Sequence, residues 1–243
     1  MSPICCKNDY FFIVKKLLLF FFVLIQAIAA KSQSYNYNSY AIGVNYNALF
    51  PYVDLATGNN TKGFGITGYY NLSSYLPLGL EFQTGELSGG GVLTDFHGRE
   101  YKNKFTAIIA RGDIFLGQVM DYGYSGPIRY LKDFYAGTGI GVISNNMAFI
   151  QRVQAKTGYV FPGKDKSLNL IVPIRVGYEL KINNTYGQPF IGINLGYVMN
   201  ITFGEGLDGY DDSSKDFKNN VQDLYRQIVL GVKVNFGPTK SNY

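Results

Sequence analysis

Residues 168–180 read LNLIVPIRVGYEL, and the alternation of side chains in this segment indicates the fold. Apolar residues occupy every second position from Leu168 to Leu180. The intervening positions include Arg175, Gly177 and Glu179. A period of two residues is typical of a β-strand whose two faces lie in different surroundings. The segment therefore predicts a strand with one apolar face and one polar face.

The same alternation recurs in seven other segments of the chain. Together with 168–180, the predicted strands are 40–47, 64–72, 78–83, 108–116, 134–142, 191–200 and 227–236. Apolar faces of this size correspond to strands of about ten residues, long enough to cross a bilayer when tilted. An open sheet would leave unpaired backbone groups in hydrocarbon, so the strands must close into a ring. We therefore expect an all-β fold, an eight-stranded antiparallel up-and-down transmembrane β-barrel over residues 35–236.

The positions of the charges indicate which face of each strand is wet. The ionisable residues inside the predicted strands all fall on the face rich in Gly and Asn: Glu81, Arg111, Asp113, Arg175, Glu179 and Lys233. A soluble barrel of the lipocalin type would turn its apolar face inward and carry more charge outside. We therefore expect an ion-pair network in the lumen, which these six residues, Tyr69 and Tyr135 would fill. A small ion pathway through that network is the alternative.

The N-terminus carries a targeting signal. Lys15 and Lys16 precede an apolar run that is too short to span a bilayer and ends in small residues. This pattern predicts a signal peptide over residues 1–30, cleaved between 29 and 34. An uncleaved N-terminal anchor is the alternative. Both cysteines, Cys5 and Cys6, would leave with the signal, and residues 237–243 would form a C-terminal tail.

The predicted connections differ in length. Those at 54–62, 88–100, 146–167 and 204–222 are longer and more polar than the turns near 73–77 and 183–187. Transmembrane barrels place short turns on the periplasmic side and longer loops outside. The connection at 118–132 falls on the short-turn side but is long. It holds either a short helix or an extension of a strand.

The last predicted strand carries a resemblance. Gly231, Val234 and Phe236 match the assembly signal of bacterial outer-membrane barrels, although Val229 replaces a usual polar residue and seven residues follow Phe236. With the alternating segments and the signal peptide, the chain resembles the OmpA/OmpX-like barrel family, particularly its Bacteroidetes-type outer-membrane β-barrel domains. The resemblance implies the outer membrane of a Gram-negative bacterium and recognition by the barrel assembly machinery.

Three motifs suggest chemistry but fit the barrel better. Residues 63–68 match G-x-G-x-x-G, but the alternating residues that follow do not predict the helix that a nucleotide site needs. The single histidine, His97, lies in a predicted loop and suggests no catalytic group. The acidic loop from Asp208 to Asp216 is either solvated or a cation site, and its spacing does not match an EF-hand. We therefore expect no catalytic residue, no metal and no cofactor.

Charge limits the classes of partner. The net charge is +5, and no dense Lys/Arg run occurs beyond the signal, so a nucleic acid partner is not expected. The expected partners are outer-membrane lipid and lipopolysaccharide, the assembly machinery, and a possible surface ligand of the loops. Lys62, Arg99, Lys102 and Lys104 either contact lipopolysaccharide phosphates or are ordinary solubilising charges. The predicted role is structural or surface interaction, and the alternative is a narrow channel or a component of a transport or secretion machine.

Overall fold

The computed structural model describes residues 36–55, 57–119, 127–154, 156–204, 206–210 and 223–241. The predicted signal peptide and its cleavage region lie outside these residues. The elements are β1 (Asn36–Tyr52), β2 (Gly58–Asn59), β3 (Thr61–Ser73), β4 (Leu76–Gly90), β5 (Glu100–Phe115), η1 (Leu116–Gln118), η2 (Pro127–Asp133), β6 (Phe134–Ile150), β7 (Lys166–Asn183), β8 (Pro189–Phe203) and β9 (Leu224–Ser241). Within the described residues, no helix is long and apolar enough to cross a membrane.

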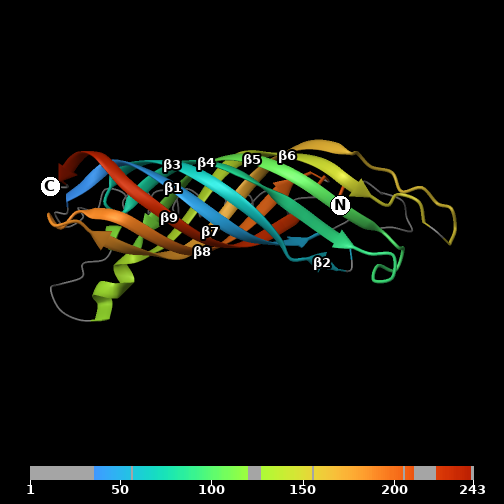
Figure 1. The fold of residues 1–243 in the computed structure, drawn as a ribbon, viewed down its shortest axis with the longest axis horizontal. Helices are drawn as coiled ribbons and strands as arrows, with labels where there is room; N and C mark the ends of the chain where they lie inside the picture. The colour runs from blue at the N-terminus through green and yellow to red at the C-terminus, as the bar shows by residue number, and fades with distance from the viewer. Residues whose placement is uncertain are drawn as a thin grey trace, which may run out of the picture.

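The eight long strands form a closed antiparallel barrel (Figure 1). Each long strand pairs with the long strands before and after it in the chain. The two-residue strand β2 pairs only with the mouth end of β4. The ring closes where β1 meets β9, in a register that runs from Asn36 opposite Ser241 to Tyr52 opposite Leu224. The predicted all-β, eight-stranded barrel is confirmed.

The long strands have 13 to 18 residues, so the expected length of about ten was too short. The extra residues lie mainly at the end that carries the long loops. There β5 begins at Glu100 and points Lys102 and Lys104 outward. Because these outward positions are polar, a search for apolar alternation ends before the strand does. β9 likewise continues to Ser241, through most of the segment that was expected to be a tail.

The two ends of the barrel differ. The tight turns after Ser73 and Asn183 lie at the same end as Asn36 and Ser241, which pair with each other. The long 116–133 connection is also at this end, and its described parts are two short 3-10 helices, η1 and η2. Figure 1 shows η2, in yellow-green, projecting from the wall near the C-terminus. We call this end the turn end and the opposite end the mouth.

The outward face is apolar over most of the barrel height. On β7, Leu168, Leu170 and Ile174 are exposed, whereas Arg175 and Glu179 on the other face are buried. Aromatic rings gather near the turn end, where Tyr40 lies 5.7 Å from Tyr70, and a matching pair, Tyr46 and Phe64, lies 5.6 Å apart nearer the mouth. Aromatic side chains toward both edges of an apolar band are typical of barrels that span a membrane.

The interior has three layers. Tyr75, Phe115 and Tyr135 pack together at the turn end, and ionised groups occupy the middle. The mouth half contains an apolar core that was not predicted: Leu49, Val53, Leu55, Leu87, Tyr101, Phe105, Ala107, Ile109, Ile143, Phe161, Ile171, Leu207, Tyr210 and Tyr225. The expected filling by the six ionisable residues, Tyr69 and Tyr135 therefore describes only part of the lumen.

The segment Gly206–Tyr210 plugs the mouth. Leu207 and Tyr210 are only 1% and 2% exposed, and the Asn103 side chain donates a hydrogen bond of 2.9 Å to the Leu207 carbonyl. The Tyr210 hydroxyl donates to the carbonyl of Gln151 at 2.8 Å. The interpretation of Asp208 as part of a solvated loop was wrong, because its side chain is also buried. Residues 211–222 of that loop lie outside the described part of the chain.

Burial raises the pKa of the Asp208 carboxyl well above its usual range, and the neighbouring Asp223 carboxylate raises it further. Burial stabilises the uncharged form of a carboxyl when no cation compensates it. Asp223 accepts backbone N–H bonds from Gly206 and Leu207 at 3.1 and 3.0 Å, and Asp208 accepts one from Tyr210 at 3.0 Å. Among the described residues, no group of His, Cys, Asp and Glu side chains is arranged to hold a metal ion.

We predict that Leu80→Arg lowers the free energy of unfolding in phosphatidylcholine vesicles by about 2–4 kcal/mol, because Leu80 is 60% exposed on the apolar band. Leu93→Arg is the matched control, because Leu93 is 99% exposed in a mouth loop and should change stability by no more than about 0.5 kcal/mol. Urea titration of the vesicle-inserted proteins measures both. Equal effects would contradict the assignment of the band.

Candidate functional site

The six ionisable residues predicted for the lumen lie inside the barrel. They come from four strands: Glu81 from β4, Arg111 and Asp113 from β5, Arg175 and Glu179 from β7, and Lys233 from β9. None is more than 6% exposed. Strand alternation explains this placement, because residues two apart on one strand point to the same side.

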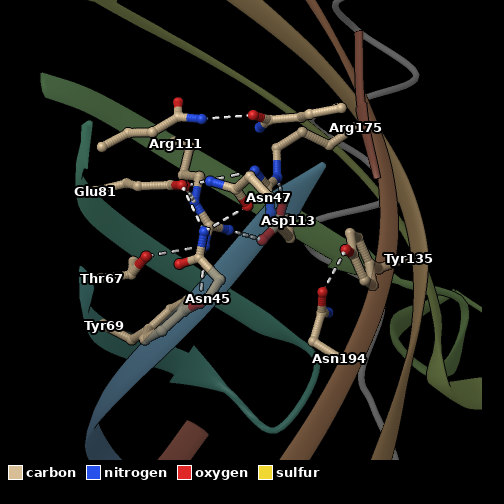
Figure 2. Close-up of polar contacts among 12 residues, drawn as sticks. Asn45, Asn47, Thr67, Tyr69, Glu81, Arg111, Asp113, Tyr135, Arg175 and Asn194 are labelled. Carbon is tan, nitrogen blue, oxygen red and sulfur yellow. Dashed lines mark hydrogen bonds and ion pairs between the residues drawn. The ribbon is translucent and has the colours of Figure 1, made fainter. Parts of the chain in front are cut away.

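Four of the six form a closed arrangement of charges, which we call the quartet: Glu81, Arg111, Asp113 and Arg175 (Figure 2). Arg111 Nε lies 2.8 Å from Glu81 Oε2, and the same guanidinium also pairs with Asp113. Arg175 lies 3.2 Å from Asp113 and 3.5 Å from Glu81. Each guanidinium therefore contacts both carboxylates, so that no ion of the quartet is buried without a counter-ion.

The other two predicted residues form a separate pair. Lys233 Nζ lies 2.8 Å from Glu179 Oε1. Tyr69 lies between this pair and the quartet. Its hydroxyl accepts a 2.7 Å hydrogen bond from Arg111, and its ring centre is 5.2 Å from Lys233 Nζ. The six residues thus form two ionic groups with an aromatic ring between them.

Neutral amides and hydroxyls complete the network in Figure 2. Asn45 donates to Asn47 at 2.9 Å and approaches Glu81 at 3.4 Å, and the Tyr135 hydroxyl donates to Asn194 at 3.2 Å. A carboxylate can accept several hydrogen bonds, and each one offsets part of the cost of burying its charge.

Glycine makes the space that the quartet fills. Gly137 lies opposite Asp113 on β5 and Arg175 on β7. A Cβ atom at Gly137 would lie 2.6 Å from the Gly112 carbonyl oxygen and would collide with the Asp113 carboxylate. The run of glycines in β6 therefore lets the charged side chains cross the lumen.

A third ionic group of the lumen, a pair at the turn end, was not predicted. Lys181 Nζ lies 3.1 Å from Asp133 and 4.3 and 4.5 Å from the ring centres of Phe115 and Tyr75. Lys181 is the next inward position after Glu179, so alternation could have identified it. Asp133 ends η2, where no periodic signal exists. This pair fixes the end of the 116–133 connection to the barrel interior.

Little space remains beside the ions. The cavity lined by Glu81, Arg111, Arg175, Glu179 and Lys233, among others, has a volume of about 20 Å³, and a second cavity around Lys181 is the same size. A volume of roughly 10–15 Å³ is needed for one water molecule. The described lumen therefore has room for isolated waters beside the ions, with the apolar core between them and the mouth.

The other residues singled out in the sequence lie apart from this network. Gly231 points inward on β9, whereas Val234 and Phe236 are 37% and 50% exposed on the apolar face. The G-x-G-x-x-G segment lies within β3 and is followed by more strand. His97 lies in a mouth loop, with its ring 4.8 Å from that of Phe96. The assembly role of Gly231, Val234 and Phe236 stays a prediction.

Solved structures of outer-membrane proteins are similar to this chain in fold. Neisserial surface protein A aligns with a TM-score of 0.48 and 12% identity, over 84% of this chain and 99% of that one. Ail, the attachment invasion locus protein of Yersinia pestis, gives 0.42 and 12%, over 82% and 99%. OprG from Pseudomonas aeruginosa gives 0.37 and 12%, over 86% and 98%.

No protein-family model and no curated protein matches the chain in sequence. The similarity to solved structures is therefore confined to the fold. The Bacteroidetes-type family, suggested by the last strand together with the alternating segments and the signal peptide, stays a prediction.

We predict that Gly137→Ala lowers the free energy of unfolding by about 1–3 kcal/mol, because the new methyl group overpacks the quartet. Gly68→Ala is the matched control, since a Cβ there meets nothing within 4 Å and points outward. Urea titration in vesicles compares the two variants. A similar loss at both positions would mean that the β-strand, and not the quartet, responds to the extra methyl.

We also predict that Arg111→Met costs about 3–5 kcal/mol of stability, because Glu81 and Asp113 would each lose a buried counter-ion. The double variant Glu179→Gln/Lys233→Met removes both charges of the separate pair and should cost less than either of its single variants. The same titration tests this order. A double variant as unstable as the sum of the singles would show that the two ions do not compensate each other.

Proposed function

We propose that the chain is an integral outer-membrane β-barrel protein of a Gram-negative bacterium, exported by a cleaved signal peptide, with a structural or surface-interaction role and no enzymatic activity. One observation carries the proposal: the apolar side chains of the eight long strands face outward while the ions are buried inside. In water this arrangement would expose a broad apolar surface, whereas in a bilayer it leaves no lipid-facing charge on the band.

The mouth supports the surface-interaction role. The loop after β4 exposes Phe96 by 87%, and within the loop Asp95 accepts backbone N–H bonds from His97 and Arg99 at 3.0 and 3.1 Å. Burial raises the pKa of Asp95, but the hydrogen bonds and charge of Arg99 lower it by more, so that the pKa lies below its usual value. A loop ordered by an ionised carboxylate presents its apolar tip at a low entropic cost of binding.

The proposed location in the outer membrane also implies how the barrel is assembled. We propose that the barrel assembly machinery recognises β9 through Gly231, Val234 and Phe236, and that outer-leaflet lipid and lipopolysaccharide surround the finished barrel. Two features support this: the outward positions of Val234 and Phe236, and the closing contact that β9 makes with β1.

Membrane fractionation combined with heat-modifiable gel mobility tests the location and the closed barrel together. We expect the protein in the outer-membrane fraction, with different mobility before and after boiling. A monomer that stays in solution without detergent would refute the proposal.

A narrow channel, or a component of a transport or secretion machine, is the second candidate. It is favoured by the polar groups that extend from Lys181 past Lys233 to Glu81. The apolar core and the plug at the mouth oppose it.

Planar-bilayer recording separates these two functions. We predict no steady openings for the wild-type protein, because the cavities beside the ions hold only about 20 Å³ each. Steady openings that vanish in Arg111→Ala or Arg175→Ala would instead support the channel.

A further inference from the structure

Polar side chains, three of them lysines, lie side by side on the outer wall of the barrel toward the mouth. The register pairs Glu86 with Lys104, Lys104 with Asn146, and Asn146 with Lys166. Gly63 pairs with Gly85, which places Lys62 alongside Glu86. Strands β3 to β7 therefore carry a continuous row of outward polar side chains.

This row lies at the upper edge of the apolar band. Two residues from it toward the turn end, the outward positions are Phe64, Thr84, Thr106, Ser144 and Leu168. Two residues further, they are all apolar: Ile66, Phe82, Ile108, Val142 and Leu170. Lys102 lies one outward position nearer the mouth on β5. We call Lys62, Lys102, Lys104 and Lys166 the lysine collar.

The ammonium groups of the collar are free to contact a ligand. All four side chains are exposed, and none takes part in an ion pair with another described residue. Arg99, which the sequence grouped with them, is different. It pairs with Asp95 at 3.3 Å and lies over the rings of Phe161 and Tyr210. Arg99 therefore orders the mouth and does not belong to the collar.

We propose that the lysine collar binds the phosphate groups of a phosphorylated glycolipid of the outer leaflet, whose acyl chains lie on the apolar band below. This inference rests on the proposed function. A bilayer places its charged headgroups just beyond the hydrocarbon, and the outward side chains of β3 to β7 change from apolar to polar along each strand as it approaches the row. Basic side chains grouped at that level attract anionic headgroups, each with a favourable contribution to binding.

The geometry also favours a lipid over a soluble anion. The collar is convex and lies on the barrel wall, and the small lumen cavities around Glu81 and Lys181 are separate from it. An anion held only by exposed lysines is bound weakly, because water competes for each ammonium group. A ligand that also covers Phe82 and Ile108 on the band gains apolar contact as well.

The full-length protein, extracted from the outer membrane in neutral detergent and freed of divalent cations, is titrated with bis-phosphorylated lipid A and followed by native mass spectrometry. We expect Lys62→Gln/Lys104→Gln to bind at least about 10-fold more weakly than wild type. The matched control is Lys156→Gln/Lys164→Gln, which removes the same charge from exposed positions of the link between β6 and β7 and should bind as wild type does.

Two further probes identify which parts of the ligand the collar recognises. Lipid A without phosphates should bind wild type about as weakly as bis-phosphorylated lipid A binds the collar variant. Inositol hexaphosphate, a soluble polyphosphate, should bind all the variants weakly. Equal losses in the collar and control variants, or equally tight binding of the soluble polyphosphate, would overturn the proposal.

The membrane location of the protein and its binding of lipid A are measured in separate experiments. If the collar variant fractionates with the outer membrane and shows heat-modifiable mobility, but binds lipid A as wild type does, this inference alone fails. If the wild-type protein is absent from the outer membrane, the proposed function fails first.

Discussion

The structure depends on the satisfaction of every backbone hydrogen bond between neighbouring strands. In hydrocarbon an unpaired N–H or C=O group costs several kcal/mol, so a spanning sheet is stable only when its first and last strands meet. Here β1 and β9 meet along nearly their whole length, from Asn36 opposite Ser241 to Tyr52 opposite Leu224. Closure fixes the alternation of faces, and that alternation decides which side chains contact lipid and which are sealed inside.

The ionic middle and the mouth half of the sealed interior are stabilised in different ways. In the middle, Arg111 and Arg175 each contact two carboxylates, so the burial of charge is offset by mutual pairing. Toward the mouth, where the strands continue past the apolar band, the interior is packed like the core of a soluble domain, with Phe105 and Ile143 fully buried. Polar side chains such as Lys102 and Lys104 cover the outside at that level.

Much of the barrel was predictable from sequence because its walls obey a strict period of two residues. Residues 168–180 show both faces clearly, and the inward positions of Arg175 and Glu179 follow from that pattern alone. The mouth core was not predictable, because inward apolar residues such as Ile109 interrupt the alternation without revealing what they contact.

A periodic pattern in the sequence could not predict the contacts that depend on the path of the loops. Asp133 reaches Lys181, and Tyr210 reaches Gln151, only because a connecting segment folds back against the barrel. The pairing within the quartet could be expected only in part. Period two places the charges in the lumen, but the register between strands decides that Arg175 meets Asp113 and that Lys233 meets Glu179.

The segment that seals the mouth lies between the last two strands, and this has a consequence for the order of assembly. The contact between Asn103 and Leu207 joins residues 104 positions apart, and closure joins the two extremes of the described chain. Contacts between distant residues form late, because the whole intervening chain must first be brought into place. Lys233 lies on β9, so its pairing with Glu179 and the closure of the wall are completed by the same strand.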